Sequence, residues 1–127
     1  MVRNLETPKD ERDNYFLIWE LDGLAVGFSS LDEIVPGKQA NMHLHVAVPF
    51  ERKRGHGAEF VKRSVPIYFD EFDLEVLYCE PYAFNTAPNR ALQKAGFEYV
   101  ETVELVPGPI NFHQAVTRWK ITRDTLG

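Results

Sequence analysis

The stretch that decides the fold is NMHLHVAVPFERKRGHGA, residues 41–58. Up to Val48 it alternates apolar and polar side chains, and this alternation predicts a β-strand with one buried face that ends at Pro49. The residues that follow, Arg52–Gly57, include three cations and two glycines. A helical pattern begins directly after them. The stretch therefore predicts a strand that leads through a basic turn into a helix.

The residues before this stretch predict an antiparallel hairpin. Tyr15–Leu21 and Leu24–Leu31 are rich in strand-forming residues, and the Asp-Gly pair between them is a strong turn signal. Together with the strand at 41–48, they predict three antiparallel strands in series. Residues 1–13 are polar and show no sustained period, so we expect them to form an arm.

The residues after the stretch predict two helices that alternate with strands. Apolar residues at near-helical spacing continue from Ala58 to Phe72, and Pro66 is expected to kink or end this helix. A shorter helix is expected at Pro88–Lys94, with Gly96 as its C-terminal cap. The remaining strands are expected at Leu74–Cys79, Phe97–Leu105 and Phe112–Ile121. The sum is a single α/β domain, residues 1–127, with a mostly antiparallel sheet.

Composition and charge limit the classes of function. The chain has 127 residues, a mass of 14.6 kDa and 44% hydrophobic residues, which is enough for one compact core. A net charge of −5 and a pI near 5.3 repel phosphate backbones and argue against a nucleic-acid binder. The single cysteine, Cys79, cannot form an internal disulfide, and no apolar run is long enough for a membrane span or a secretion signal. We therefore expect a soluble, cytoplasmic protein without a membrane or nucleic-acid partner.

The segment Arg52–Ala58 is the strongest candidate for a binding site, and the expected ligand is an anion. Glycines let backbone N–H groups approach a phosphate closely, while a helix start adds unpaired N–H groups and the positive end of its dipole. The alternative is a solvated basic turn in which the glycines serve only the backbone geometry. The P-loop pattern is absent, and Gly55-x-Gly57 lacks the third glycine of the dinucleotide fingerprint.

Two motifs resemble those of the GNAT superfamily of acyl-CoA-dependent N-acyltransferases, and they occur in the family's order. Arg52–Ala58 is similar to R-x-x-G-x-G/A, and Asn85–Phe97 resembles N-x-x-[AS]-x-x-x-x-x-K-x-G-F. The wording of Lys94–Phe97 is most similar to the branch of ribosomal-protein N-terminal acetyltransferases. The resemblance implies a mixed, mostly antiparallel central sheet with two main helices. Because residues 1–13 are short, we expect the family's usual N-terminal strand and helices to be lacking.

The resemblance also implies how the co-substrate, acetyl-CoA, is bound. Its pyrophosphate would be held by Arg52, Lys53, Arg54, Gly55, His56, Gly57 and Ala58, mainly through backbone amides. The backbone of His45, Val46 and Ala47 would pair with the pantetheine arm, and one amide there would polarise the thioester carbonyl. Asn85 would contact the pantetheine or the acetyl end.

Proton transfer leaves several candidates open. Leu92 falls where many family members carry a tyrosine that protonates the departing thiolate, so this chain lacks the common acid. Glu80 lies five residues before Asn85, which resembles the spacing of a catalytic glutamate in some ribosomal-protein acetyltransferases, so the resemblance makes it the first candidate for a general base. A carboxylate in a partly dry cleft can take a proton from an attacking ammonium. The alternative is a surface glutamate at a strand end. His43 and His45 share one face of their strand, and either could replace Glu80.

A metal site is a rival interpretation of the same strand. His43 and His45 have a metal-ligand spacing, with Glu51 downstream as a third ligand. The glycine-rich helix start that follows, in place of more strands, argues against this interpretation, and no metal is expected. Cys79 is interpreted as a small buried apolar residue.

The sequence therefore predicts an acetyl-CoA-dependent N-acetyltransferase that moves an acetyl group to a primary amine by direct attack in a ternary complex. The acceptor would be a protein N-terminus, a lysine or a small amine. The alternative is a non-catalytic acyl-CoA-binding or protein-interaction domain with a degenerate GNAT fold, suggested by Leu92 and the short start. Surface left open by missing helices would favour a homodimer.

Overall fold

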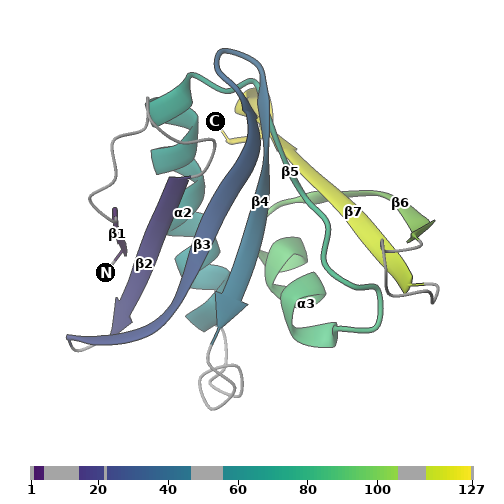
Figure 1. The fold of residues 1–127 in the computed structure, drawn as a ribbon, viewed down its shortest axis with the longest axis horizontal. Coiled ribbons are helices and arrows are strands. Elements are labelled where there is room, and N and C mark those ends of the chain that lie inside the picture. Colours follow the sequence, from purple (N-terminus) through teal and green to yellow (C-terminus); the bar gives the residue numbers. More distant parts are fainter. Residues whose placement is uncertain (1, 5–14, 22, 47–55, 106–113, 127) are drawn as a thin grey trace.

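A computed structural model describes residues 2–4, 15–21, 23–46, 56–105 and 114–126 (Figure 1). Its strands are β1 (Val2–Asn4), β2 (Tyr15–Leu21), β3 (Leu24–Val35), β4 (Gln39–Val46), β5 (Val76–Cys79), β6 (Glu98–Leu105) and β7 (Gln114–Thr122). Its helices are α2 (His56–Phe72), α3 (Thr86–Lys94) and the short α4 (Arg123–Leu126), which the sequence analysis did not anticipate. The strands form one seven-stranded sheet in the order β1-β2-β3-β4-β5-β7-β6.

The sheet is mostly antiparallel, as predicted. The hairpin of β2 and β3 and the third strand, β4, pair antiparallel in sequence order. Among the described strands, β4 and β5 form the one parallel pair, and β5, β7 and β6 continue antiparallel. The predicted α/β fold class is therefore confirmed.

The register of the strands gives the sheet one apolar and one polar face. A transverse row of residues that pair directly from strand to strand is buried, and it consists of Tyr15, Leu31, Met42, Cys79 and Trp119. The adjacent row points to the opposite face and is largely polar; it consists of Asp32, Asn41, Tyr78, Lys120 and Glu98. Because side chains alternate along a strand, a shift of one residue would exchange the two faces.

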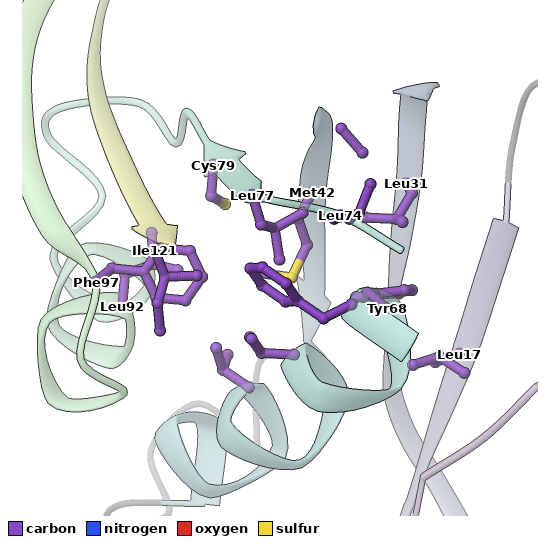
Figure 2. Close-up of a cluster of buried hydrophobic side chains, with 14 of the residues drawn as sticks. Leu17, Leu31, Met42, Tyr68, Leu74, Leu77, Cys79, Leu92, Phe97 and Ile121 are labelled. Carbon is purple, nitrogen blue, oxygen red and sulfur yellow. The ribbon is translucent and has the colours of Figure 1, made fainter. Parts of the chain in front are cut away.

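Helices α2 and α3 cover the apolar face. Tyr15 packs edge-on against Tyr68 and Phe72 of α2, with ring centroids 6.0 and 5.0 Å apart. Trp119, at the other end of the row, donates a hydrogen bond from Nε1 to Oδ1 of Asn89 in α3, at 2.8 Å. Figure 2 shows the side chains of this core between the sheet and the helices. The two helices therefore lie on the same side of the sheet.

The core includes polar groups that are satisfied by hydrogen bonds. Trp19 stacks on Phe60, with centroids 5.4 Å apart, and its indole Nε1 donates to Oγ of Ser64 at 3.0 Å. The hydroxyls of Ser29 and Tyr68 lie 2.6 Å apart. Because an unpaired buried polar group destabilises the folded state, these bonds fix where α2 sits on the sheet.

Two sequence expectations need correction. Pro66 was expected to kink or end the first helix. It does not end the helix, and α2 continues past it to Phe72. Burial explains why, because Val65 before the proline and Tyr68 after it are at most 1% exposed, and their packing holds the helix together. The N-terminal strand was expected to be lacking, but Val2–Asn4 forms β1 and pairs antiparallel with β2. The expected absence of helices between these strands concerns residues 5–14, which lie outside the described residues.

The remaining boundaries differ by a few residues. β3 extends to Val35, beyond the expected end at Leu31, and α3 begins at Thr86, before the expected start at Pro88. Gly96 has a φ of +98°, as expected for the residue that ends this helix. No described helix is long and apolar enough to cross a membrane.

Candidate active site

The candidate site begins where the parallel strands β4 and β5 separate. Their last paired residues are Met42 and Cys79. β4 continues to Val46, and within the described part of the chain this segment has no partner on β5. His43 and Glu80 are the first residues beyond the last pair, one on each strand, so the register places both predicted proton-transfer candidates at the point of separation.

The chain after β5 follows β7 instead of β4. Thr117 N–H donates to the carbonyl of Pro81 and Ala83 N–H donates to the carbonyl of Ala115, each at 2.9 Å. Tyr82 also forms an isolated antiparallel bridge with Val116. Figure 1 shows the result, with the lower end of β4 and the segment that follows β5 diverging. A stretch of β4 backbone is thereby left for another group to pair with.

The first turn of α2 lies at the same end of the sheet. A Cβ added at Gly57 would lie 3.8 Å from Cβ of Ala91, so the start of α2 packs against α3. The unpaired N–H groups and the positive dipole end of α2 therefore lie at the same end of the sheet as the separating strands (Figure 1). Of the predicted pyrophosphate residues, Arg52, Lys53, Arg54 and Gly55 lie outside the described residues, as does Ala47, and of His56 only the backbone is described.

Glu80 is held by an ion pair. Its Oε2 accepts a hydrogen bond from Nε of Arg118 at 2.6 Å, and Nη1 of Arg118 donates to Oε2 of Glu101 at 2.7 Å. The hydrogen bond with Glu80 is the main cause of a raised pKa of Arg118. The side chain of Glu80 is 26% exposed. Glu80 is therefore an oriented, part-buried carboxylate, and sequence reasoning missed the residue that orients it.

His43 and His45 lie on the polar face, away from α2 and α3. Nε2 of His43 is 3.0 Å from Oδ1 of Asp32, within ion-pair distance but without the geometry of a hydrogen bond. The ring of His45 stacks on Phe28 with centroids 4.4 Å apart. His45 is exposed overall, but partial desolvation of its ring, and secondarily the charge of His43, lowers its pKa. His45 is therefore neutral near pH 7 and able to accept a proton.

The metal interpretation finds no set of ligands among the described residues. No group of three or more His, Cys, Asp or Glu side chains in this part of the chain is arranged to hold a metal ion. Glu51, the third ligand of that interpretation, lies outside it.

Leu92 and Cys79 both belong to the core. Leu92 is 0% exposed and lies with Phe97 and Ile121 on the sheet side of α3 (Figure 2). The leucine at the position of the family's common tyrosine is therefore part of the hydrophobic core. Cys79 is 2% exposed, and burial raises the pKa of its thiol, so its interpretation as a small buried residue is confirmed.

Asn85 stands at the N-terminus of α3 and its side chain makes no capping hydrogen bond. Instead, Asn89 one turn later donates from Nδ2 to the backbone carbonyls of Asn85 and Tyr82, at 2.7 and 3.0 Å. Sequence reasoning missed Asn89. The signal was present as two asparagines four residues apart at a helix start, a spacing at which side chains lie on one face.

Comparisons with known proteins place the fold and the family. A family described as "Acetyltransferase (GNAT) domain" matches residues 1–98. The chain therefore belongs to the GNAT acetyltransferase family and carries an acetyltransferase domain. No curated protein matches the chain significantly.

Three solved structures illustrate the structural similarity. A variant of spermidine N-acetyltransferase from Vibrio cholerae is 16% identical and has a TM-score of 0.75. The match covers 91% of this chain and 69% of the spermidine N-acetyltransferase chain. Ribosomal-protein-S5-alanine acetyltransferase from Vibrio fischeri is 11% identical, with coverage of 94% and 67% and a TM-score of 0.77. An aminoglycoside acetyltransferase in complex with coenzyme A is 19% identical, with coverage of 91% and 70% and a TM-score of 0.72. At these identities the likeness concerns the fold alone.

Proposed function

We propose that this chain transfers the acetyl group of acetyl-CoA to a primary amine by direct attack. The observation that carries the proposal is the separation of β4 and β5 after Met42 and Cys79, at the same end of the sheet as the start of α2. The backbone of His45 and Val46 would pair with the pantetheine arm. The start of α2, with the basic segment that precedes it, would hold the pyrophosphate.

The acceptor class follows from the chemistry of the site. An amine nitrogen attacks the thioester carbon, the carbon–sulfur bond breaks, and the CoA thiolate leaves. Amino groups are mostly protonated near pH 7, so a base must first remove a proton. Glu80 would take it directly or through water, while Arg118 keeps the carboxylate in place.

Known neighbours support an amine acceptor without choosing one. The names of the similar structures include spermidine, ribosomal-protein alanine and aminoglycoside acetyltransferases. A protein N-terminus, a lysine side chain and a small amine all remain within the proposal. The resemblance to the ribosomal-protein branch favours a peptide N-terminus as the first acceptor to test.

The cofactor is tested by calorimetric titration with acetyl-CoA. The wild type should bind, and Arg52→Ala/Arg54→Ala should weaken binding at least about tenfold, because two of the cations that would add to the backbone amides at the pyrophosphate are removed. Lys62→Ala/Arg63→Ala is the matched control, since it removes the same charge from exposed positions of α2. A bulky residue at Gly57 is a poorer probe, because it would push α2 from Ala91. Equal affinities in the two double variants would contradict the pyrophosphate assignment.

Turnover separates an enzyme from a non-catalytic acyl-CoA-binding domain. Release of the CoA thiol is measured with a free-N-terminus peptide, a lysine peptide and a polyamine as acceptors. Glu80→Gln should lower kcat by about 10²- to 10⁴-fold and leave acetyl-CoA affinity unchanged. Glu101→Gln removes the other carboxylate on Arg118 and should have a smaller effect. Binding without turnover on every acceptor would favour the non-catalytic alternative.

A further inference from the structure

The N-terminus of α3 is built in an unusual way. Asn85 occupies the capping position with extended backbone dihedrals, φ −82° and ψ 97°, yet its side chain makes no capping bond. A capping side chain normally accepts from the N–H of the second or third helical residue. Here the third residue is Pro88, which has no N–H to donate, and it stands where the quoted family motif has Ala or Ser. Pro88 thus removes one partner that would hold the side chain of Asn85.

Asn89 holds the backbone of the same turn. The two hydrogens of its Nδ2 serve two carbonyls, that of Asn85 at 2.7 Å and that of Tyr82 at 3.0 Å. Its Oδ1 accepts from Nε1 of Trp119 at 2.8 Å. Because an indole N–H only donates, this contact fixes which way the amide of Asn89 points.

The anchor of this arrangement, Trp119, is buried on a paired strand. Trp119 is 9% exposed and lies on β7, where it pairs directly with Cys79 of β5. The turn itself is closed by a bond from Asn85 N–H to the Tyr82 carbonyl at 3.1 Å. The backbone of Asn85 is therefore tied to the sheet through Asn89 and Trp119, while its exposed side chain is not used for capping.

We propose that Asn89 is a positioning residue that, together with Pro88, presents the side-chain amide of Asn85 to the acyl-CoA. The inference rests on the proposed function, in which Asn85 contacts the pantetheine or the acetyl end. Because the turn is fixed before the ligand arrives, less entropy is lost on binding. Because the side-chain amide of Asn85 makes no capping hydrogen bond, no such bond has to break when the ligand binds. Asn89 itself touches the turn and not the ligand.

The first test removes the two hydrogen bonds that the side chain of Asn89 donates. Asn89→Asp still accepts from Trp119, but it sets carboxylate oxygens against the carbonyls of Tyr82 and Asn85. The Kd for acetyl-CoA should rise about fivefold, the equivalent of about one hydrogen bond. Gln93→Glu is the matched control, because it makes the same amide-to-acid change at an exposed position of α3 and should leave the Kd within about twofold. The inference would be overturned if Asn89→Asp folds and binds acetyl-CoA with the same Kd as the control variant.

The second test restores the capping partner. Pro88→Ala supplies the missing N–H, so the side chain of Asn85 becomes engaged in capping. Acetyl-CoA should then bind about fivefold more weakly although the thermal midpoint does not fall, a combination that a merely structural role would not produce. In an Asn85→Ala background, Pro88→Ala should leave the Kd unchanged within about twofold, since no capping amide remains.

The outcomes distinguish a failure of this inference from a failure of the proposed function on which it rests. If the wild type fails to bind acetyl-CoA, the proposed function fails. If the wild type binds but the effects of Pro88→Ala and Asn85→Ala on the Kd are additive, the function stands and the role of Asn89 and Pro88 is wrong. Trp119→Phe, which keeps the aromatic packing and removes the indole donor, serves if Asn89→Asp does not fold, and it should weaken binding in the same direction.

Discussion

At the scale of single residues, the surroundings of a side chain decide which chemistry it can perform. His45 and His43 are the same residue type two positions apart on one strand face, but His45 stacks on Phe28 whereas His43 lies beside Asp32. Partial desolvation lowers the pKa of His45, an effect that its position in the sequence could not reveal. The two imidazoles are therefore not equivalent candidates for a base.

The lowered pKa of His45 has a consequence for stability. As pH falls through about 6.5, the unfolded chain takes up a proton at this residue before the folded chain does. The free energy of unfolding should therefore decrease between pH 7.5 and pH 5, and the decrease should be smaller in His45→Phe, which keeps an aromatic ring against Phe28. Urea unfolding at several pH values measures this difference.

The neighbouring histidine supplies the control for that prediction. His43→Asn removes the smaller cause of the shift and leaves burial, so most of the pH dependence assigned to His45 should remain. A wild type and a His45→Phe variant with the same slope would show that His45 is not the group responsible.

Residue types at the candidate site could be predicted, but their partners could not. Asn85 follows from the motif at Asn85–Phe97, and Glu80 from its spacing before that motif. Arg118 and Trp119, which orient Glu80 and Asn89, come from a strand more than twenty residues later, and only the register of β5 with β7 brings them together. Long-range pairing of this kind leaves no local pattern in the sequence.

At the scale of elements, local sequence patterns predicted the helices and strands correctly where those patterns agreed with the burial of the side chains. The hairpin of β2 and β3 follows from strand formers around an Asp-Gly turn, and Gly23 has the positive φ that such a turn requires. Pro66 is the exception, because tertiary packing of α2 on the sheet outweighs the local preference. β1 was missed because three residues are too few to show a period.

Helix α2 therefore carries a removable defect. Pro66 is exposed, lacks an N–H and lies in the helix interior, so Pro66→Ala should stabilise the protein. The gain in helix propensity of about 3 kcal/mol exceeds the loss of about 1 kcal/mol from a more flexible unfolded chain, and the net effect is about 2 kcal/mol. Urea unfolding checks it, with Lys62→Ala on the same helix as a control near zero. A variant less stable than the wild type would mean that Pro66 supports the fold.

At the scale of the whole molecule, one register organises both the core and the candidate site. The row from Tyr15 to Trp119 directs α2 and α3 to the same face, and the start of α2 lies at the same end of the sheet as the end of β4 (Figure 1). The separation of β4 and β5 occurs directly after that row, at Met42 and Cys79. The expected homodimer stays a prediction, which sedimentation at decreasing protein concentration addresses.

The central claim is that the end of β4, which pairs with β3 but has no partner on β5, and the start of α2 bind acetyl-CoA. Hydrogen–deuterium exchange with and without acetyl-CoA tests it most directly. Exchange should slow at 43–46 and at 56–58, and it should be unchanged in the paired segment 39–42 and in β6. Saturating acetyl-CoA that leaves the exchange of 43–46 and 56–58 unchanged would contradict the account.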